Sequence, residues 1–386
     1  MKPLRLLLIA LTLLATAASA QTTVIDVTKH HVKADGRTLC TDAINKAVSK
    51  ASAGDVVLFP AGRYLTGTIH LRSGVTLRLD EGAEIIGSPN IDDYDSYIPT
   101  KDMSRYDTGA GTRNANVTTD ARWTKALILG VGCDLVSIEG RGTINGQHLE
   151  DALGEESMRG PHTILLAECR EAHVSDVSIT RASNYAVLGY ELQRADFARL
   201  HITQGWDGIH IRGGGNISIE DCVIETGDDA IAGGYWNTMR ISGCTLNSSC
   251  NGLRIIEPCD DVTVTSSNIY GPGRYPHRTR LPHPIAEPLP AGHDLIYGVV
   301  IEPGAWGRAP GDVGKVTIAD TNIDNTWAPV AYSMGDDNNC HALYMQNVKG
   351  TNIRGVAQPV NRQDCVKSWN VMKLDNVEVS SSSLKN

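Results

Sequence analysis

Three short stretches, repeated at a constant interval, decide the fold of this chain. They are W-D-G-I-H-I at residues 206–211, T-G-D-D-A-I-A-G-G at residues 226–234 and S-S-C-N-G-L-R-I at residues 248–255. Asp207, Asp229 and Asn251 occupy equivalent places in the three stretches and follow one another in steps of 22 residues. A repeat of this length predicts a solenoid, in which each repeat forms one coil.

The apolar residues around these stretches keep the same interval. Five of them are spaced by 23, 22, 22 and 23 residues: Ile179, Ile202, Ile224, Leu246 and Ile269. Short runs of alternating β-branched residues are broken by Gly, Asn and Asp, which is typical of strands separated by turns. The recurring leucine motif and the helix of a leucine-rich repeat are not visible. We therefore predict an all-β fold, a right-handed parallel β-helix.

Stacking of the coils places residues that are one repeat apart beside each other. Adjacent coils lie about 4.8 Å apart, the spacing between the strands of a sheet. Asp207, Asp229 and Asn251 should then form a column on one face, with Asp228 beside it. At the N-terminal end, helical spacing of apolar residues in residues 41–51 predicts a helix with Thr41 or Asp42 as its N-cap, and this helix would close the open first coil.

The first twenty residues have the pattern of an export signal. Lys2 and Arg5 flank the start of a short apolar run, and Ala18-Ser19-Ala20 is a small-residue cleavage site. We expect a signal peptide at residues 1–20 and a secreted or periplasmic protein. Residues 21–386 are expected to form a single β-helix domain, because a solenoid grows by adding coils. No later apolar run of about 18 residues predicts a membrane span.

The charge of the chain restricts its partners. Without the leader, 33 basic and 44 acidic residues give a formal charge of −11. This charge argues against nucleic acid or an anionic membrane as a partner, and we expect a monomer that binds a polysaccharide or oligosaccharide.

Two segments interrupt the repeat. Residues 92–123 are expected to cross one side of the solenoid. Residues 271–294 concentrate positive charge, including Arg274, His277 and Arg278. This second segment is either a solvated surface loop or a lid that holds an acidic sugar over the neighbouring carboxylates.

Nine cysteines in an exported chain permit disulfides. Cys222 and Cys244 lie one repeat apart and should be stacked neighbours, for which two buried thiols are favoured over a bridge. Cys340 and Cys365 are candidates for a bridge in the last coils. Because no Cys or His spacing is typical of zinc, we expect neither a metal nor a cofactor.

Asp207, Asp228 and Asp229 are the candidate catalytic residues. Like charges that lie close together raise at least one pKa, so one carboxyl can stay protonated while its neighbours are ionised. An acid and a base that flank a glycosidic bond are what glycoside hydrolysis requires. Two other interpretations stay open at this point: stacked turn residues that bind backbone amides, and a calcium site.

Longer motifs resemble those of glycoside hydrolase family 28, the polygalacturonase and rhamnogalacturonan hydrolase group. F-P-A-G-R-Y-L-T-G-T-I-H-L at residues 59–71 and G-T-I-N-G-Q at residues 142–147 are similar to its early coils. Gly205-Trp206-Asp207 matches its N-T-D motif, and Gly227-Asp228-Asp229 matches its G-D-D motif. The resemblance, over most of the chain, implies that Asp229 is the general acid. Asp207 and Asp228 would position and deprotonate the attacking water, with inversion and without a metal.

Two family motifs are altered in this chain. G-H-G falls on Cys250-Asn251-Gly252, so Asn251 replaces a histidine and cannot take up a proton. R-I-K falls on Val300-Ile301-Glu302, so an acid stands where the family binds a uronic carboxylate. Either an arginine from elsewhere holds that carboxylate, or the sugar at this position is not a uronide. The predicted substrate-binding residues are Asn251, Arg254, Arg274, Arg278, Tyr297 and Glu302.

The predicted function is a secreted glycoside hydrolase that cleaves a pectin-like or related polysaccharide by inverting single displacement. A β-helix polysaccharide lyase is one alternative. A non-catalytic, carbohydrate-binding β-helix is the other, because two family motifs are altered.

Overall fold

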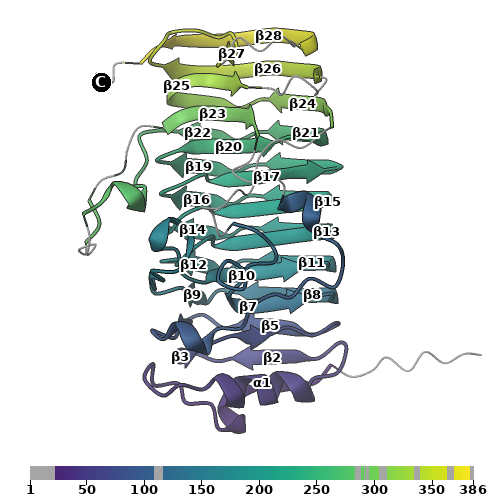
Figure 1. Ribbon diagram of the computed structural model, residues 1–386, viewed down its shortest axis with the longest axis vertical. Helices are drawn as coiled ribbons and strands as arrows, with labels where there is room; N and C mark the ends of the chain where they lie inside the picture. The colour runs from purple at the N-terminus through teal and green to yellow at the C-terminus, as the bar shows by residue number, and fades with distance from the viewer. Residues whose placement is uncertain are drawn as a thin grey trace, which may run out of the picture.

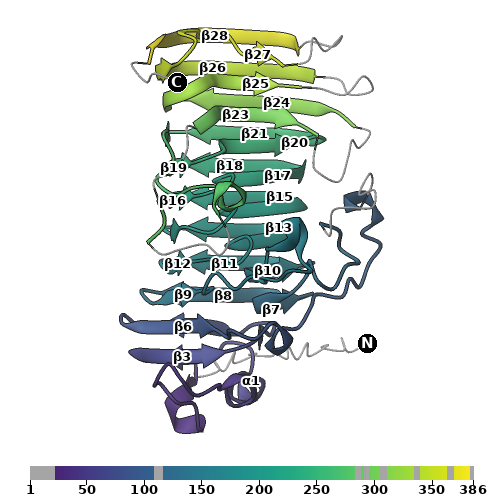
Figure 2. The same cartoon turned by 60° about the vertical axis from the view of Figure 1, so that its left-hand side comes forward.

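Parallel strands, stacked coil on coil, make up nearly all of the molecule (Figure 1, Figure 2). The structure, a computed structural model, describes residues 22–107, 116–282, 288–290, 292, 295–303, 311–333, 340–362 and 369–382. Within these residues 28 strands form one continuous sheet, and the paired strands run parallel. The predicted parallel β-helix is therefore confirmed.

The strand pairings divide each coil among three columns. The first column contains β4 (Ile69–His70), β7 (Ala126–Val131), β10 (His162–Ala167), β13 (Val187–Ala198), β15 (Ile209–Glu220), β17 (Ile231–Trp236), β20 (Asn251–Ile256), β23 (Leu295–Glu302), β25 (Asn322–Tyr332) and β27 (Val360–Asn361). The second column contains β1 (Val24–Asp26), β2 (Val56–Phe59), β5 (Thr76–Leu79), β8 (Asp134–Gly140), β11 (Arg170–Ser175), β18 (Thr238–Ser242), β21 (Cys259–Thr265), β24 (Val313–Ala319), β26 (Cys340–Asn352), β28 (Trp369–Ser381) and the second halves of β13 and β15. The third column contains β3 (Gly62–Thr66), β6 (Ala83–Gly87), β9 (Thr143–Asn145), β12 (Ser178–Thr180), β14 (His201–Thr203), β16 (Val223–Thr226), β19 (Thr245–Ser248) and β22 (Asn268–Tyr270).

The aliphatic repeat of the sequence forms a ladder in the third column. Its members pair in register from β12 through β14, β16 and β19 to β22. None of the five side chains has any exposed area: Ile179, Ile202, Ile224, Leu246 and Ile269. The 22-residue interval of the sequence is thus one coil of the solenoid, and each coil buries its apolar face against the next.

A single α-helix among the described residues covers the N-terminal end of the stack, as predicted (Figure 1). It spans Thr41–Lys50 and buries Ile44, Ala47 and Val48. The expected cap is wrong, because Cys40 is the N-cap and forms no side-chain capping bond. The Thr41 hydroxyl instead accepts a hydrogen bond from the Gly67 amide at 2.7 Å, which ties the helix to the first coils. No helix in the described part of the chain is both long and apolar enough to cross a bilayer.

The described part of residues 92–123 packs on the outer face of the first column, which confirms that this segment crosses one side of the solenoid. Tyr97, Tyr106 and Trp123 are buried there in one cluster with Tyr190 of β13. The indole Nε1 of Trp123 donates a hydrogen bond to the Tyr190 hydroxyl at 2.9 Å. Short 3₁₀ helices occur in this and other connections: η1 (Val27–His30), η2 (Ile91–Asp93), η3 (Ser104–Tyr106), η4 (Glu155–Ser157) and η5 (Arg278–Arg280).

Cys222 and Cys244 are two buried thiols on neighbouring coils, as predicted. Each sulfur lies 3.3 Å from a main-chain carbonyl oxygen, that of Glu220 and that of Ser242 respectively. Cys365 lies outside the described residues, so its bridge to Cys340 stays a prediction.

Candidate active site

Three polar residues form a column where the strands of the first column begin. The Gly208 amide donates a hydrogen bond to the carbonyl oxygen of Asp229 at 3.0 Å, and the Ala230 amide donates one to that of Asn251 at 3.0 Å. Asp207, Asp229 and Asn251 are therefore neighbours on consecutive coils, and all three are buried. Their side chains contact polar groups, which are described below.

Asp228 is the most exposed of the three aspartates, with 14% of its side chain accessible. Its Oδ2 accepts a hydrogen bond from Arg159 Nη2 at 3.1 Å and lies 3.3 Å from Nε2 of His277. Burial acts to raise the pKa of Asp228, but the hydrogen bond from His277 and the charge of Arg159 outweigh it. The pKa is held well below its usual range, so Asp228 is a carboxylate.

Asp229, its neighbour in sequence, has the opposite shift. Burial raises the pKa of Asp229, and the charge of Asp228 raises it further, to about 6. Its Oδ1 accepts hydrogen bonds from the amide of Asn251 at 3.1 Å and from its side chain at 2.7 Å. Its Oδ2 lies 3.7 Å from Nη1 of Arg254. Near pH 6 this group can therefore both keep and release a proton.

Asp207 completes the cluster one coil away. Burial raises the pKa of Asp207 well above its usual value, and the charges of Asp228 and Asp229 act in the same direction. Its Oδ2 lies 2.6 Å from Nδ1 of His210, three residues further along the chain. Burial also lowers the pKa of His210, so the ring is neutral.

Arg159 is a residue of the site that sequence reasoning missed. It lies just after η4 in a connection outside the repeat, so the 22-residue interval does not mark it. Its side chain is 5% exposed, contacts Glu155 and Glu156 as well as Asp228, and lies 3.9 Å from the centre of a Trp206 ring. The guanidinium is thus fixed by three carboxylates and an aromatic face beneath the candidate site.

His277 comes from the second interruption of the repeat. The sequence predicts positive charge near the carboxylates in this segment but indicates no specific role for His277. Residues 271–282 of this segment reach the cluster, and η5 lies in front of β15 and β16 in Figure 2. A Cβ on Gly227 would lie 2.3 Å from the carbonyl oxygen of Pro276, so a glycine before Asp228 permits this approach. The lid interpretation gains support, while its contact with an acidic sugar stays a prediction.

Of the predicted substrate-binding residues, Asn251 and Arg254 lie at the cluster. Asn251 donates to Asp229, as described above, and its Nδ2 also lies 3.3 Å from Cys250 Sγ. Arg254 Nε lies 3.2 Å from Glu302 Oε1, and its Nη2 donates to the carbonyl oxygen of Pro303 at 3.2 Å. Arg254 thus lies between Asp229, the candidate general acid, and Glu302 of the altered R-I-K motif.

Glu302 lies between two arginines, Arg254 and Arg362. The negative charge of Glu302 would repel a bound uronic carboxylate, but these two cations compensate it. Tyr297 pairs in register with Asn251 and is therefore the next residue of the polar column. Only 8% of Tyr297 is exposed, and its ring packs edge-on against Trp327 at 5.5 Å. Its use as a sugar platform stays a prediction.

Arg274 and Arg278 each pair with a glutamate. Arg274 is on the surface, and its Nη1 lies 3.0 Å from Glu225 Oε2. Arg278 is buried and donates to Glu150 at 3.0 Å. Because these contacts form in the folded loop, neither position follows from sequence spacing.

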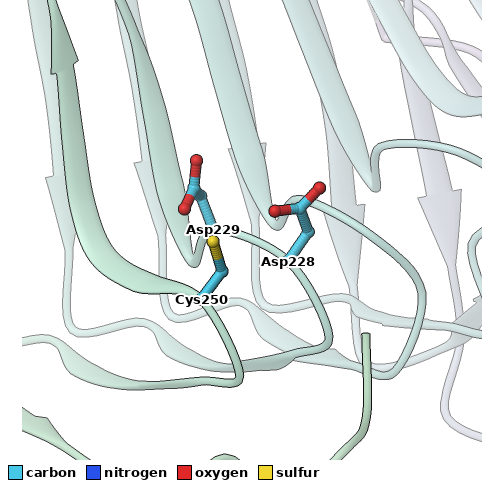
Figure 3. A group of neighbouring side chains, drawn as sticks. All are labelled: Asp228, Asp229 and Cys250. Atoms are coloured by element: carbon cyan, nitrogen blue, oxygen red, sulfur yellow. The ribbon is translucent and has the colours of Figure 1, made fainter. Parts of the chain in front are cut away.

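Asp228, Asp229 and Cys250 bring a carboxylate, a second carboxylate and a sulfur within 4.8 Å of one another (Figure 3). Figure 3 shows the three side chains projecting to the same side from two neighbouring turns. Sulfur is not a ligand that calcium prefers, and Arg159, His277 and Arg254 already compensate the carboxylates. The donor set therefore does not favour the calcium interpretation.

The central coils match a known family in sequence. Residues 162–343 match the family described as right handed beta helix region. The chain is 26% identical over 258 residues to an exo-poly-α-D-galacturonosidase from Dickeya chrysanthemi, covering 56% of this chain and 42% of that protein. It is 28% identical over 214 residues to a probable polygalacturonase from Vitis vinifera, covering 51% and 41%. The alignments span about two fifths of the length of these two curated relatives.

A solved structure shows that the similarity in fold extends further. A polygalacturonase from Erwinia carotovora superposes with a TM-score of 0.66 and 18% sequence identity. The alignment covers 96% of this chain and 98% of that protein. The whole described solenoid therefore shares its architecture with that β-helix.

Proposed function

Given that this chain is a divergent, family 28-like relative of the polygalacturonases, we propose that it is an exported glycoside hydrolase acting on a pectin-like or related polysaccharide. The observation that carries the proposal is the split between two adjacent aspartates. The pKa of Asp229 is raised to about 6, and that of Asp228 is held well below its usual range. Two titratable groups whose surroundings move their pKa values apart supply an acid and a base at one pH.

The roles follow from the protonation states. Protonated Asp229 donates its proton to the glycosidic oxygen as the bond to the anomeric carbon breaks. Asp228, ionised and the most open to solvent of the three, accepts a proton from the water that attacks this carbon. Asp207 assists in orienting that water. Each turnover consumes one water, and transfer of the proton from Asp228 back to Asp229 through solvent restores the starting state.

The stereochemistry is a separate element of the proposal. The closest ligand oxygens of Asp228 and Asp229 lie within 4.8 Å, whereas carboxyl groups of inverting pairs are typically about 6.5 to 9.5 Å apart. Inversion is therefore proposed from the family resemblance and not from this separation. Proton NMR of the first product decides it, because an inverting enzyme releases the anomer opposite to that of the substrate bond.

Product analysis on a panel of pectic and neutral polysaccharides tests the reaction type. We expect new reducing ends without ultraviolet absorbance from unsaturated sugars. Unsaturated products would replace the hydrolase with a lyase. Binding to the panel without any cleavage would favour a non-catalytic carbohydrate-binding protein. The polysaccharide that is cleaved also identifies the sugar. The contacts of Glu302 with Arg254 and Arg362 do not decide between a uronide and a neutral sugar.

The pH dependence of kcat/KM should show Asp229 as the acid. Because the pKa of Asp229 is raised to about 6, the proton needed for the leaving group is lost above this pH. We expect kcat/KM to fall about tenfold per pH unit on the alkaline side of pH 6, with Asp228 ionised throughout. Initial rates between about pH 4 and 8 measure this limb. A profile that stays flat to pH 8 would contradict the assignment of the acid.

A further inference from the structure

His210 is a buried residue of the cluster that neither the repeat nor the family motifs mark as functional. Its side chain is 4% exposed, and its Nδ1 lies 2.6 Å from Asp207 Oδ2. We propose that His210 is a positioning residue that presents one N–H group to Asp207, in a tautomer fixed by Arg212. This inference rests on the proposed hydrolase function for its kinetic consequence, but its structural part does not.

Arg212 determines which ring nitrogen carries the hydrogen. Its Nε donates a hydrogen bond to Nε2 of His210 at 3.3 Å. A guanidinium has only donors and is always charged, so Nε2 must offer its lone pair. In a neutral imidazole the other nitrogen then carries the hydrogen. The bond to Asp207 therefore runs from Nδ1–H of His210 to a carboxylate oxygen.

The surroundings hold this arrangement rigidly. The ring of His210 stacks on Tyr185 with centroids 4.7 Å apart and planes 5° from parallel. Arg212 has no exposed area, and its Nη1 donates to the Tyr190 hydroxyl at 3.3 Å. Its Nη2 donates to the side-chain oxygen of Asn116. The charged or titratable groups that act on His210 through space are Arg212, Arg254, His162 and Asp228.

The consequence concerns the second oxygen of Asp207. In the part of the chain that the structure describes, the polar contact to this carboxyl falls on Oδ2. An N–H donor to Oδ2 favours the ionised form of Asp207 and leaves Oδ1 for a water molecule. Burial and the neighbouring aspartates act against ionisation, and this hydrogen bond opposes them together with the charges of Arg159 and Arg254. Asn251, which replaces the family histidine, cannot exchange protons. His210 lies at a different position and holds Asp207, the aspartate that orients the water.

Two substitutions of His210 separate a positioning role from simple packing. In His210→Asn, the amide nitrogen can take the place of Nδ1 and still donate to Asp207. In His210→Leu, similar volume remains without a donor.

We expect kcat/KM to fall about 10- to 100-fold in His210→Leu and by less than about threefold in His210→Asn. On the acid side of the pH optimum, protonation of Asp207 should slow the reaction, because the protonated carboxyl no longer orients the water. This fall in rate should begin about one pH unit higher in His210→Leu only, because the lost donor raises the pKa of Asp207. Equal losses in both variants, without a shifted limb, would overturn the positioning role.

Nitrogen-15 NMR of the unsubstituted protein, without substrate, tests the tautomer independently of catalysis. We expect the signals of a neutral ring protonated at Nδ1 near pH 6, with assignment by the absence of these signals in His210→Asn. A ring protonated at Nε2, or a doubly protonated ring, would overturn the proposal even if hydrolysis is established. Conversely, the expected tautomer in a protein that cleaves no glycan would leave the His210–Asp207 bond standing and refute the hydrolase alone. If His210→Leu does not fold, the tautomer of His210 and the activity of His210→Asn still test the positioning role.

Discussion

Asp229→Asn is expected to lower kcat/KM on an unactivated glycosidic bond by about 10²- to 10⁴-fold, the usual contribution of a positioned general acid. The amide keeps the shape of the side chain but has no proton to transfer to the leaving oxygen. Initial rates of reducing-end release, compared with the unsubstituted protein at the same pH, measure the effect. Unchanged activity would contradict the assignment of Asp229 as the acid.

The leaving group provides a sharper control for this variant. Aryl glycosides whose phenol leaves readily need little protonation, so Asp229→Asn should lose much less activity on them than on a polysaccharide. Asp260→Asn is the matched control, because Asp260 is an exposed aspartate outside the cluster. We expect this control to keep full activity on both substrates. A uniform loss on both substrates in Asp229→Asn would indicate a disturbed fold instead of a missing acid.

Arg159→Met is expected to destabilise the fold by about 3–5 kcal/mol, because removing one partner of a buried ion pair leaves an uncompensated charge. Arg159 is 5% exposed and contacts Asp228, Glu155 and Glu156. Arg170→Met is the control: Arg170 is 63% exposed and pairs with Asp134 on the surface, so its loss should leave the free energy of unfolding nearly unchanged. Urea unfolding at neutral pH measures both free energies, and similar values for the two variants would contradict the prediction.

The cost of Arg159→Met should also depend on pH. The folded-state pKa of Asp228 is depressed, so its pairing stabilises the fold above the unfolded pKa of about 4, and this contribution is lost as the pH falls. In the variant, protonation of Asp228 removes the uncompensated charge. The difference in unfolding free energy between the two proteins should therefore shrink below about pH 4. A difference that is constant between pH 7 and 3 would assign the cost to lost packing against Trp206.

Much of the fold could be predicted from the sequence because a solenoid is periodic. Each coil contacts the next at a fixed spacing, so residues 22 positions apart become neighbours whatever the loops do. The ladder that contains Ile224 and the stacking of Asp207, Asp229 and Asn251 follow from this rule alone. The paired thiols of Cys222 and Cys244 follow from it as well.

The two cationic partners of Asp228 belong to connections that have no period. Arg159 and His277 lie in segments between coils, and only the folded path of these segments brings both to Asp228. The same holds for Arg274 and Arg278, which pair with other carboxylates.

The sequence by itself determined which three acids meet. Asp207 and Asp229 are separated by the length of one coil, and Asp228 directly precedes Asp229. The tertiary structure alone decided their protonation. Adjacent Asp228 and Asp229 differ because burial and hydrogen bonding, which no spacing encodes, act on them unequally: two cationic groups contact one carboxyl, and an amide and a more distant guanidinium surround the other.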